Sequence, residues 1–494
     1  MSKMQSQSVF HFFISGLTLI VGAVNNLFIF SADLDFKGLF DFLLTAATVI
    51  ALLGGTGIGA LPLKFFPIFE TKDGKNNGLL SLCIVGGLSM SLAIILILHI
   101  LLYFNDHIGS KFLMTVASHK WVVSFLIMLV VQNQIIVKYL HNYQKVSLTT
   151  FVTSFIFKLL TGLVFLLAIQ KIISITFALK SIPLILLFEW LIMMYYLYRL
   201  NNNGFTWIDR QFLAPRFKTE IIPYAIAGIF MTISYTIIDK ITLSMLGVLA
   251  GFKENGIFAI NSYIATLVLI PYISIVALYA PVISKAMANS DYEKVQEKYR
   301  KSSDFLLAFG ILIFLLIWAN IDLLPLISKN ITEVINHKYV IFFIALGYFV
   351  NMTCSVNDHI IAYSKSYQFN IWAGIILIVT DVLFNYLLIP IYGVYGAGIA
   401  AGLSLTIFNV VKSWFIFKKW KMNVLHENTL WIFALGAVTF IGLNFLNIGY
   451  FWGMLFLKNL LILLVFLVPL IYFGRSEILE ELKGKYLKPY LSKF

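Results

Sequence analysis

Charged residues are scarce in this sequence. Only 12% of the 494 residues are Asp, Glu, Lys or Arg, whereas 60% are apolar and the mean hydropathy is +0.90. Soluble globular domains are about half apolar and about one quarter charged. A water-soluble core could not hide so much apolar surface, so we expect lipid to be the solvent for most of the chain.

Cysteine is nearly absent as well. The two cysteines, Cys83 and Cys354, both lie in apolar runs, and the eight histidines show no ligand spacing. These features exclude a disulfide framework and argue against a metal centre built from Cys and His.

The sequence also lacks a nucleotide-binding loop. The run Gly54-Gly55-Thr56-Gly57-Ile58-Gly59 follows no predicted strand and precedes no Gly-Lys-Ser/Thr, whereas a phosphate-binding loop has both. We expect it to let a membrane helix bend or pack closely. Any uphill transport would then use an ion gradient, the membrane potential or substrate supply. We therefore expect no cofactor beyond a coupling ion, Na⁺ or H⁺.

Long apolar runs predict about fourteen transmembrane helices, because a bilayer core requires about 20 apolar residues per helix. The fold class is thus an all-α polytopic membrane protein. The predicted spans cover residues 9–31, 39–63, 79–104, 121–138, 148–169, 181–198, 221–248, 257–283, 304–327, 339–363, 370–390, 397–417, 429–447 and 453–473.

The formal net charge of +13 has its explanation in this topology. Lys and Arg concentrate in the loops that face the cytoplasm when both termini are inside, as the positive-inside rule requires. We therefore expect a bacterial inner-membrane protein with cytoplasmic termini, membrane lipids as neighbours and no nucleic-acid partner.

An internal repeat relates the second and eighth spans. Gly38-Leu39-Phe40 and Gly256-Ile257-Phe258 open them. Ala-Thr follows each glycine at the same offset (Ala47-Thr48 and Ala265-Thr266), then a proline at offset 24 or 25 (Pro62 and Pro281) and a lysine (Lys64 and Lys285). Unless this similarity between Leu-rich helices is chance, it predicts two six-helix lobes with a site between them. We assign residues 1–200 and 201–420 to the lobes, and 421–494 to helices 13 and 14 and a cytoplasmic tail.

The stretch Asn385 to Ala400, NYLLIPIYGVYGAGIA, carries a family resemblance. It is similar to the N-x-x-L-I-P-x-Y-G-x-x-G-A-x-x-A passage of polysaccharide exporters in the multidrug/oligosaccharidyl-lipid/polysaccharide (MOP) superfamily. Physically, Pro390 ends a helix, the glycine-rich turn reverses the chain, and Gly398-x-x-x-Gly402 offers a close-packing face. Segments 38–64 and 238–258 resemble the same family. The resemblance implies a V-shaped bundle that opens alternately to each side, with helices 13 and 14 as additions typical of its flippase branch.

Charges inside spans cost about 2.5–3.5 kcal/mol on insertion scales, so each requires a partner or a purpose. Asp239 lies in the seventh span, and Asp381 and Asn385 lie one turn apart in the eleventh. By resemblance to the lipid II flippase branch, these residues imply a Na⁺ site, with Ser404 as a further ligand, although the Asp–Asn order is reversed here. The alternatives are a structural hydrogen-bond cluster and proton coupling through Asp239.

Lys64 and Lys240 are the candidate contacts to an anionic lipid diphosphate. Lys64 could equally be a snorkelling residue at the membrane surface. Asn25, Asn26, Asn261 and Tyr263 are candidate sugar-binding residues, and interhelical hydrogen bonding is their alternative role. Lys158 and Glu189, near the middle of spans 5 and 6, are expected to form a structural ion pair.

Together these features predict a Wzx-type flippase for polyprenyl-diphosphate-linked oligosaccharide, such as an O-antigen or capsule repeat unit. Its expected partners are the lipid-linked oligosaccharide, glycosyltransferases and a glycan polymerase, with the protein itself a monomer. One alternative is a cation-coupled multidrug antiporter of the same superfamily. The other is a membrane polymerase or ligase, which is disfavoured because the longest predicted outer loop, residues 105–120, holds few catalytic side chains. We do not expect an enzyme.

Overall fold

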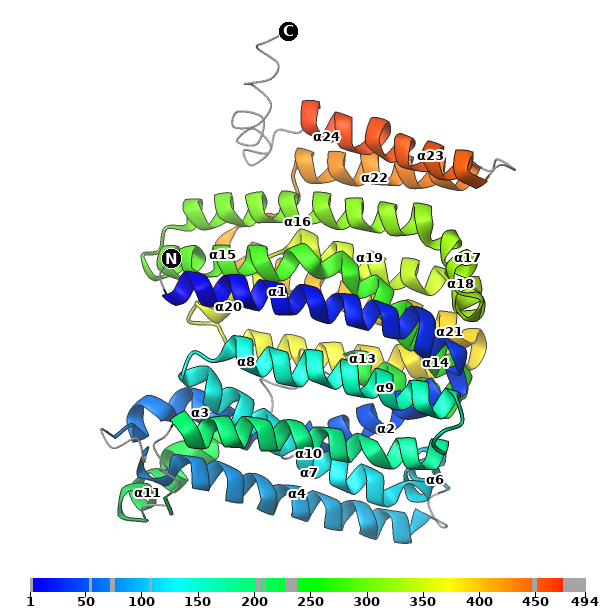
Figure 1. Cartoon of the computed structure of the whole chain (residues 1–494). Helices are drawn as coiled ribbons and strands as arrows, with labels where there is room; N and C mark the ends of the chain where they lie inside the picture. The colour runs from blue at the N-terminus through cyan, green and yellow to red at the C-terminus, as the bar shows by residue number, and fades with distance from the viewer. Residues whose placement is uncertain are drawn as a thin grey trace. The chain divides into compact units, whose positions relative to one another are not determined.

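The computed structural model describes the chain except residues 1–2, 53–55, 72–75, 106–108, 201–205, 208–209, 227–237, 447–450 and 474–494. Throughout this described part the secondary structure is helical and contains no strand (Figure 1). The predicted all-α polytopic class is therefore confirmed. The chain divides into two compact units, residues 1–257 and 258–494.

Unit 1 contains the helices up to the start of α14, which continues into unit 2. Their bounds are α1 Lys3–Val24, η1 Asn25–Ile29, η2 Phe30–Ala32, α2 Leu34–Leu52, α3 Thr56–Phe69, η3 Asn76–Gly78, α4 Leu79–Tyr103, α6 Lys111–Ser118, α7 Lys120–Asn142, α8 Val146–Thr150, η4 Phe151–Ile156, α9 Phe157–Ile169, α10 Ile175–Leu200, α11 Arg210–Arg216, η5 Phe217–Ile221, α13 Ile238–Leu249 and α14 Phe252–Thr266.

Unit 2 contains the remaining helices. Their bounds are η6 Leu267–Leu269, α15 Ile270–Ala288, α16 Tyr292–Asn320, η7 Ile321–Leu323, α17 Leu324–Ile327, η8 Lys329–Ile331, α18 Thr332–Asn336, α19 Tyr339–Cys354, α20 Asn357–Ala362, α21 Phe369–Trp420, α22 Glu427–Phe445, α23 Phe451–Leu461, η9 Ile462–Leu467 and α24 Val468–Phe473.

Ten helices in the described residues are long and apolar enough to cross a membrane, and two bent helix pairs would raise the number to twelve. One of the ten, the 52-residue α21, contains both the eleventh and the twelfth predicted spans. Helices occupy every predicted span, although parts of the second, seventh and thirteenth lie outside the described residues. The two-lobe, V-shaped arrangement stays a prediction.

Helix α7 is the centre of unit 1. It packs against α2, α3, α4 and α10. In the most apolar stretch of α7, 61% of the residues are buried, compared with 28–39% in the corresponding stretches of α1, α4, α9 and α10. The cause is a continuous apolar face in which Leu126, Ile127, Ile135 and Ile136 are fully buried. Because α7 touches so many neighbours, polar side chains on it face protein rather than lipid.

The two glycines that open the sequence repeat meet inside unit 1. A Cβ atom on Gly38 would collide with the carbonyl of Phe252, and one on Gly256 would collide with the carbonyl of Leu34. Each glycine thus meets the residue four positions before the other. The Asn255 amide strengthens this contact by donating to the Gly38 carbonyl at 2.9 Å. Such reciprocal contacts arise where two segments are related by a two-fold axis.

In unit 2 the predicted chain reversal lies three residues beyond Pro390, at Gly393. There φ is 55° and ψ is −131°, values that L side chains rarely adopt. A Cβ on Gly396 would collide with the carbonyl of Leu388, whereas residues eight apart in a straight helix are about 12 Å apart along its axis. Pro390 therefore lies inside α21, and the glycine makes the turn.

The predicted Gly398-x-x-x-Gly402 packing face is confirmed and lies against α19. A Cβ on Gly402 would collide with the carbonyl of Phe343, and one on Gly347 would come within 2.9 Å of the Gly402 backbone. In lipid the hydrophobic effect does not drive helices together, so close packing of two backbones at small residues contributes to their association instead.

This contact predicts that Gly347→Ala destabilises the protein, because the added methyl group forces α19 away from α21. Overpacking of this kind costs about 1–3 kcal/mol. The measurement is thermal unfolding of the full chain in detergent, with Gly16→Ala as the matched control, because nothing lies within 4 Å of a Cβ at Gly16. Equal melting temperatures for the two variants would contradict the packing.

Candidate functional site

A buried ion pair marks the start of the second span in unit 1. The Lys37 ammonium lies 2.7 Å from both carboxylate oxygens of Asp41, one helical turn later in α2, and the two side chains are 9% and 12% exposed. Lys37 also lies over the ring of Phe30, 4.6 Å from its centroid. Pairing offsets the cost of removing both charges from water, and removing one partner would leave the other uncompensated.

Helix α13 packs against α2 and adds two more charges to this site. The Ser244 hydroxyl donates to Thr45 at 3.2 Å, and the Thr45 hydroxyl donates to the Asp41 carbonyl at 2.7 Å. Lys240 interacts electrostatically with both Asp239 and Asp41. We call Lys37, Asp41, Asp239 and Lys240 the α2–α13 charge cluster.

The four members of the α2–α13 charge cluster differ in exposure. Lys37 and Asp41 are buried, Lys240 is half-buried and Asp239 is exposed. Sequence reasoning identified Asp239 and Lys240 but missed Lys37 and Asp41, although a Lys and an Asp four residues apart in one helix are a readable signal for an ion pair.

The other predicted substrate-binding residues of unit 1 lie elsewhere. Lys64 on α3 is exposed, with its ammonium 4.5 Å from the ring centroid of Tyr224. The Asn25 amide donates to the Lys158 carbonyl at 2.6 Å, and the Asn26 amide donates to the Gly22 carbonyl at 2.7 Å. Both buried amides therefore hold backbone segments in place.

Lys158 and Glu189 are not brought together. The Lys158 ammonium points towards α1, where the Thr18 carbonyl lies 3.4 Å away. Glu189 lines a cavity beside α7, and among the described residues no ion pair joins it to Lys158. The two helices are neighbours, but their charged side chains point to different sides.

Unit 2 contains the remaining predicted residues. Asp381, Asn385 and Ser404 are all fully buried on α21, on either side of Gly393, and the Asn385 amide donates to the Asp381 carbonyl at 2.9 Å. The Na⁺ site that combines them with Asp239 stays a prediction, because Asp239 belongs to the other unit. The described residues contain no group of three or more His, Cys, Asp or Glu side chains that could hold a metal ion.

Asn261 and Tyr263 lie on α14. Asn261 is fully buried and its amide donates to the Val334 carbonyl at 3.2 Å, whereas Tyr263 is half-buried. As with Asn25, the contact made by Asn261 is a link between helices.

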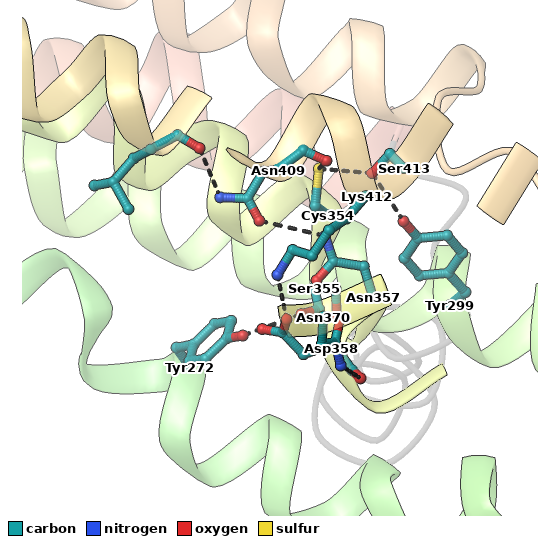
Figure 2. Close-up of polar contacts among 11 residues, drawn as sticks. Tyr272, Tyr299, Cys354, Ser355, Asn357, Asp358, Asn370, Asn409, Lys412 and Ser413 are labelled. Atoms are coloured by element: carbon teal, nitrogen blue, oxygen red, sulfur yellow. Dashed lines mark hydrogen bonds and ion pairs between the residues drawn. The ribbon is translucent and has the colours of Figure 1, made fainter. Parts of the chain in front are cut away.

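A second buried ion pair lies in unit 2, between Asp358 on α20 and Lys412 on α21 (Figure 2). Lys412 is fully buried. Beside the pair, the Asn357 amide donates to Asn409 at 3.3 Å. Sequence reasoning missed this pair, although both charges fall inside predicted spans, where each requires a partner.

This ion pair lies where a membrane helix is broken. Ser355 has φ 42° and ψ −109°, and it separates α19 from α20. The Tyr272 hydroxyl donates to the carbonyl freed at Ser355 at 3.1 Å (Figure 2). The Ser355 hydroxyl donates to Ser302 at 2.6 Å. Broken helices are tolerated at membrane depth only where protein or water satisfies the freed backbone groups.

Comparison with known proteins gives fold similarity without sequence similarity. No protein-family model matches the chain, and no curated protein matches it. Among solved structures, the lipid II flippase MurJ in an inward closed conformation aligns with a TM-score of 0.65 at 16% identity, covering 96% of this chain and 99% of that one. An inward-facing multidrug resistance MATE family transporter of the MOP superfamily aligns at 0.63 and 14% identity, covering 82% and 94%.

A third alignment is to a MOP superfamily transporter from Pyrococcus furiosus, with a TM-score of 0.52 at 13% identity, covering 84% of this chain and 95% of that chain. The chain thus has the multi-pass helical fold that these MOP superfamily transporters share. The matched proteins are transporters and flippases rather than enzymes.

The buried pair in unit 2 generates a stability prediction. Lys412→Met should destabilise the protein by about 3–5 kcal/mol, because it leaves Asp358 buried without its cation. The double variant Asp358→Asn/Lys412→Met should recover most of that loss, since neither charge remains. Thermal unfolding in detergent measures both, and a double variant no more stable than Lys412→Met would contradict the pairing.

Proposed function

We propose that this protein flips a polyprenyl-diphosphate-linked oligosaccharide, such as an O-antigen or capsule repeat unit, from the cytoplasmic to the outer leaflet of a bacterial inner membrane by alternating access. We further expect it to act as a monomer beside glycosyltransferases and a glycan polymerase.

The observation that carries the proposal is the α2–α13 charge cluster. A lipid diphosphate carries at least two negative charges, which must be neutralised while the headgroup crosses the bilayer. Lys240 is half-buried and interacts with two carboxylates, Asp41 and Asp239. These carboxylates attract the lysine ammonium before substrate arrives, and a diphosphate can then replace them as its partner. Ammonium groups bind phosphate well as point charges.

The likeness to the lipid II flippase supports the same substrate class. That alignment covers 96% of this chain and 99% of the flippase, whereas the MATE transporter alignment covers 82% of this chain. The difference includes room for helices 13 and 14, which correspond here to α22 and the α23–α24 segment. A protein named as a lipid II flippase is thus similar in fold over almost the whole length.

The reciprocal contact of Gly38 and Gly256 supports the alternating-access step. The two helices approach backbone to backbone, and the Asn255 amide donates to the Gly38 carbonyl. A contact between glycines involves few interdigitated side chains. Such a contact can therefore separate and reform as the protein changes its conformation.

The transport experiment is flipping of a polyprenyl-diphosphate-linked sugar by the full chain in proteoliposomes, measured as protection from an impermeant reagent. Lys240→Ala should lower the rate about tenfold or more, because a charge-assisted contact is worth about 1.5–3 kcal/mol. Asp239→Ala should also lower the rate. The matched control is Lys285→Ala, an exposed lysine of α15, which should stay within about twofold of the unmodified protein.

The outcomes separate the candidate functions. If Lys240→Ala and Asp239→Ala both flip the lipid-linked sugar at the rate of the unmodified protein, the α2–α13 charge cluster has no role in the mechanism. Efflux of a cationic dye by the unmodified protein, without flipping of the lipid-linked sugar, would favour the multidrug antiporter instead.

A second variant tests the glycine contact. Gly38→Val should prevent the close approach of α2 and α14 and slow flipping in the same assay, while Gly16→Val should not, because a Cβ at Gly16 meets nothing within 4 Å. Full flipping by folded Gly38→Val protein would exclude a role for this contact in the transport cycle.

A further inference from the structure

The chain segment between α21 and α22, residues 421–426, lies along α16 in unit 2. We call it the connector. It is not helical, and its side chains Met422 and Val424 are 3% and 5% exposed because they enter an apolar cluster with Val295 and Tyr299 of α16. The connector is therefore packed against α16 where it leads into α22.

Two polar side chains of α16 bind the backbone of the connector. The Gln296 amide donates to the Asn423 carbonyl at 2.7 Å, and its oxygen accepts from the Asn423 backbone N–H at 2.8 Å. The Arg300 guanidinium donates to the same carbonyl at 3.0 Å. Gln296 and Arg300 are four residues apart and so share one face of the helix. Asp304 lies one turn further along that face and makes the third attachment.

The third attachment joins Asp304 to His426, the last residue of the connector. Nε2 of the ring lies 3.0 Å from Oδ2 of Asp304, and Nδ1 lies 2.9 Å from the Val424 carbonyl. The Thr429 hydroxyl donates to Oδ1 of Asp304 at 3.1 Å, and Asp304 is 4% exposed. Its carboxyl group is thus held by both the connector and the first turn of α22.

Both nitrogens of the His426 ring therefore face oxygen atoms that accept hydrogen bonds. A backbone carbonyl can only accept, and so can an ionised carboxylate. A neutral imidazole has one N–H group, whereas the protonated ring has two. A neutral ring could accept from the Thr429 hydroxyl, which is 2.9 Å from Nδ1, but the Val424 carbonyl would then face a nitrogen without a proton. Only the protonated ring satisfies both contacts.

The charges around the ring favour the same state. The hydrogen bond to Asp304 raises the pKa of His426 above its ordinary range, although partial burial and the Arg300 guanidinium act in the opposite direction. Glu427, the next residue of the chain, is exposed. Of these kinds of side chain, imidazole is the one that ordinarily changes its charge between about pH 5 and pH 8.

We propose that His426 and Asp304 form a pH-sensitive fastening, in which the protonated ring holds the connector to α16 and loss of a ring proton releases it. The attached ring binds its proton more tightly than a free ring does. Its contribution to stability is therefore complete below about pH 6.5 and is lost as the pH rises above that value. The predicted topology puts the connector on the cytoplasmic side, so alkaline pH on that side would release it.

The opposite end of α16 holds the last helices without titratable groups. The Trp318 indole donates to Asn444 of α22 at 3.3 Å, and the amides of Asn320 and Asn459 of α23 exchange hydrogen bonds at 3.3 and 3.1 Å. None of these four side chains changes its charge with pH. A rise in pH thus loosens α22 at the connector and leaves its far end attached, whatever the protein transports.

Hydrogen–deuterium exchange of the full-length protein in detergent tests the fastening. The readout is the protection factor of residues 421–429, a ratio to the intrinsic exchange rate that removes the direct effect of pH on exchange. We expect it to fall about fivefold or more from pH 5.5 to pH 8.5, as for one charge-assisted hydrogen bond that water partly screens. The turn at residues 289–291, which is held by backbone hydrogen bonds and contains no histidine, should keep its protection.

Three variants assign the effect to the pair. His426→Gln should lower the protection at acid pH to the level that the unmodified protein has at alkaline pH, because glutamine can donate to Asp304 but never becomes charged. Asp304→Asn should abolish the pH dependence as well. The matched control is His337→Gln, another half-buried histidine of unit 2, whose ring lies 2.9 Å from the Glu333 carbonyl. It should leave the pH dependence unchanged.

The same measurements can overturn the proposal. Protection of the connector that is constant with pH, or that increases with pH, would exclude a protonated ring as the fastening. Unchanged pH dependence in folded His426→Gln or Asp304→Asn, or its loss in His337→Gln, would assign the effect to another group. None of these readings requires transport, so they are separate from the test of the proposed flippase function.

Discussion

A charge inside a bilayer has no water to solvate it, and the arrangement of this protein follows from how each buried charge finds a partner. In unit 1, Lys37 and Asp41 pair within one helix, one turn apart. In unit 2, Lys412 and Asp358 pair between two helices. Both solutions fix side-chain positions, because breaking either pair would leave an uncompensated charge in a medium of low dielectric constant.

Backbone groups obey the same constraint. The break at Ser355 frees a carbonyl group, which Tyr272 satisfies with its hydroxyl. The reversal at Gly393 keeps helix on both sides of a residue with positive φ. In both places the polypeptide changes direction where the energetic cost is low, because a nearby donor satisfies the freed carbonyl or a glycine tolerates the positive φ. Around the break at Ser355, polar side chains gather, among them Ser302 and Asp358.

The sequence was sufficient for features that depend on local chemistry. Apolar run length located the helices, and the glycines at 393, 398 and 402 located a turn and a packing face, because glycine has the same consequence in any neighbourhood. The repeat around Gly38 and Gly256 was also readable. Its reciprocal backbone contact could not be foreseen, since that required knowing that the two helices meet.

Features that depend on the direction of a side chain could not be predicted from the sequence. Lys158 and Glu189 lie in consecutive spans, and sequence alone suggested a pair, yet one points to α1 and the other to a cavity beside α7. Asp358 and Lys412 are 54 residues apart, and only the packing of α20 on α21 makes them partners. Chain neighbours in a helical bundle share an interface, but the rotation of each helix about its axis decides which residues enter it.

This distinction explains why Glu189 differs from the other buried charges. Lys37, Asp41, Asp358 and Lys412 each have a partner supplied by the fold itself, so they contribute to one stable arrangement. Glu189 shares its cavity with two amide oxygens that lack donors and a lysine that does not reach it. Among the described residues, Oε1 of Glu189 accepts no hydrogen bond, so this buried acid is not held by a contact of the kind that fixes the two ion pairs.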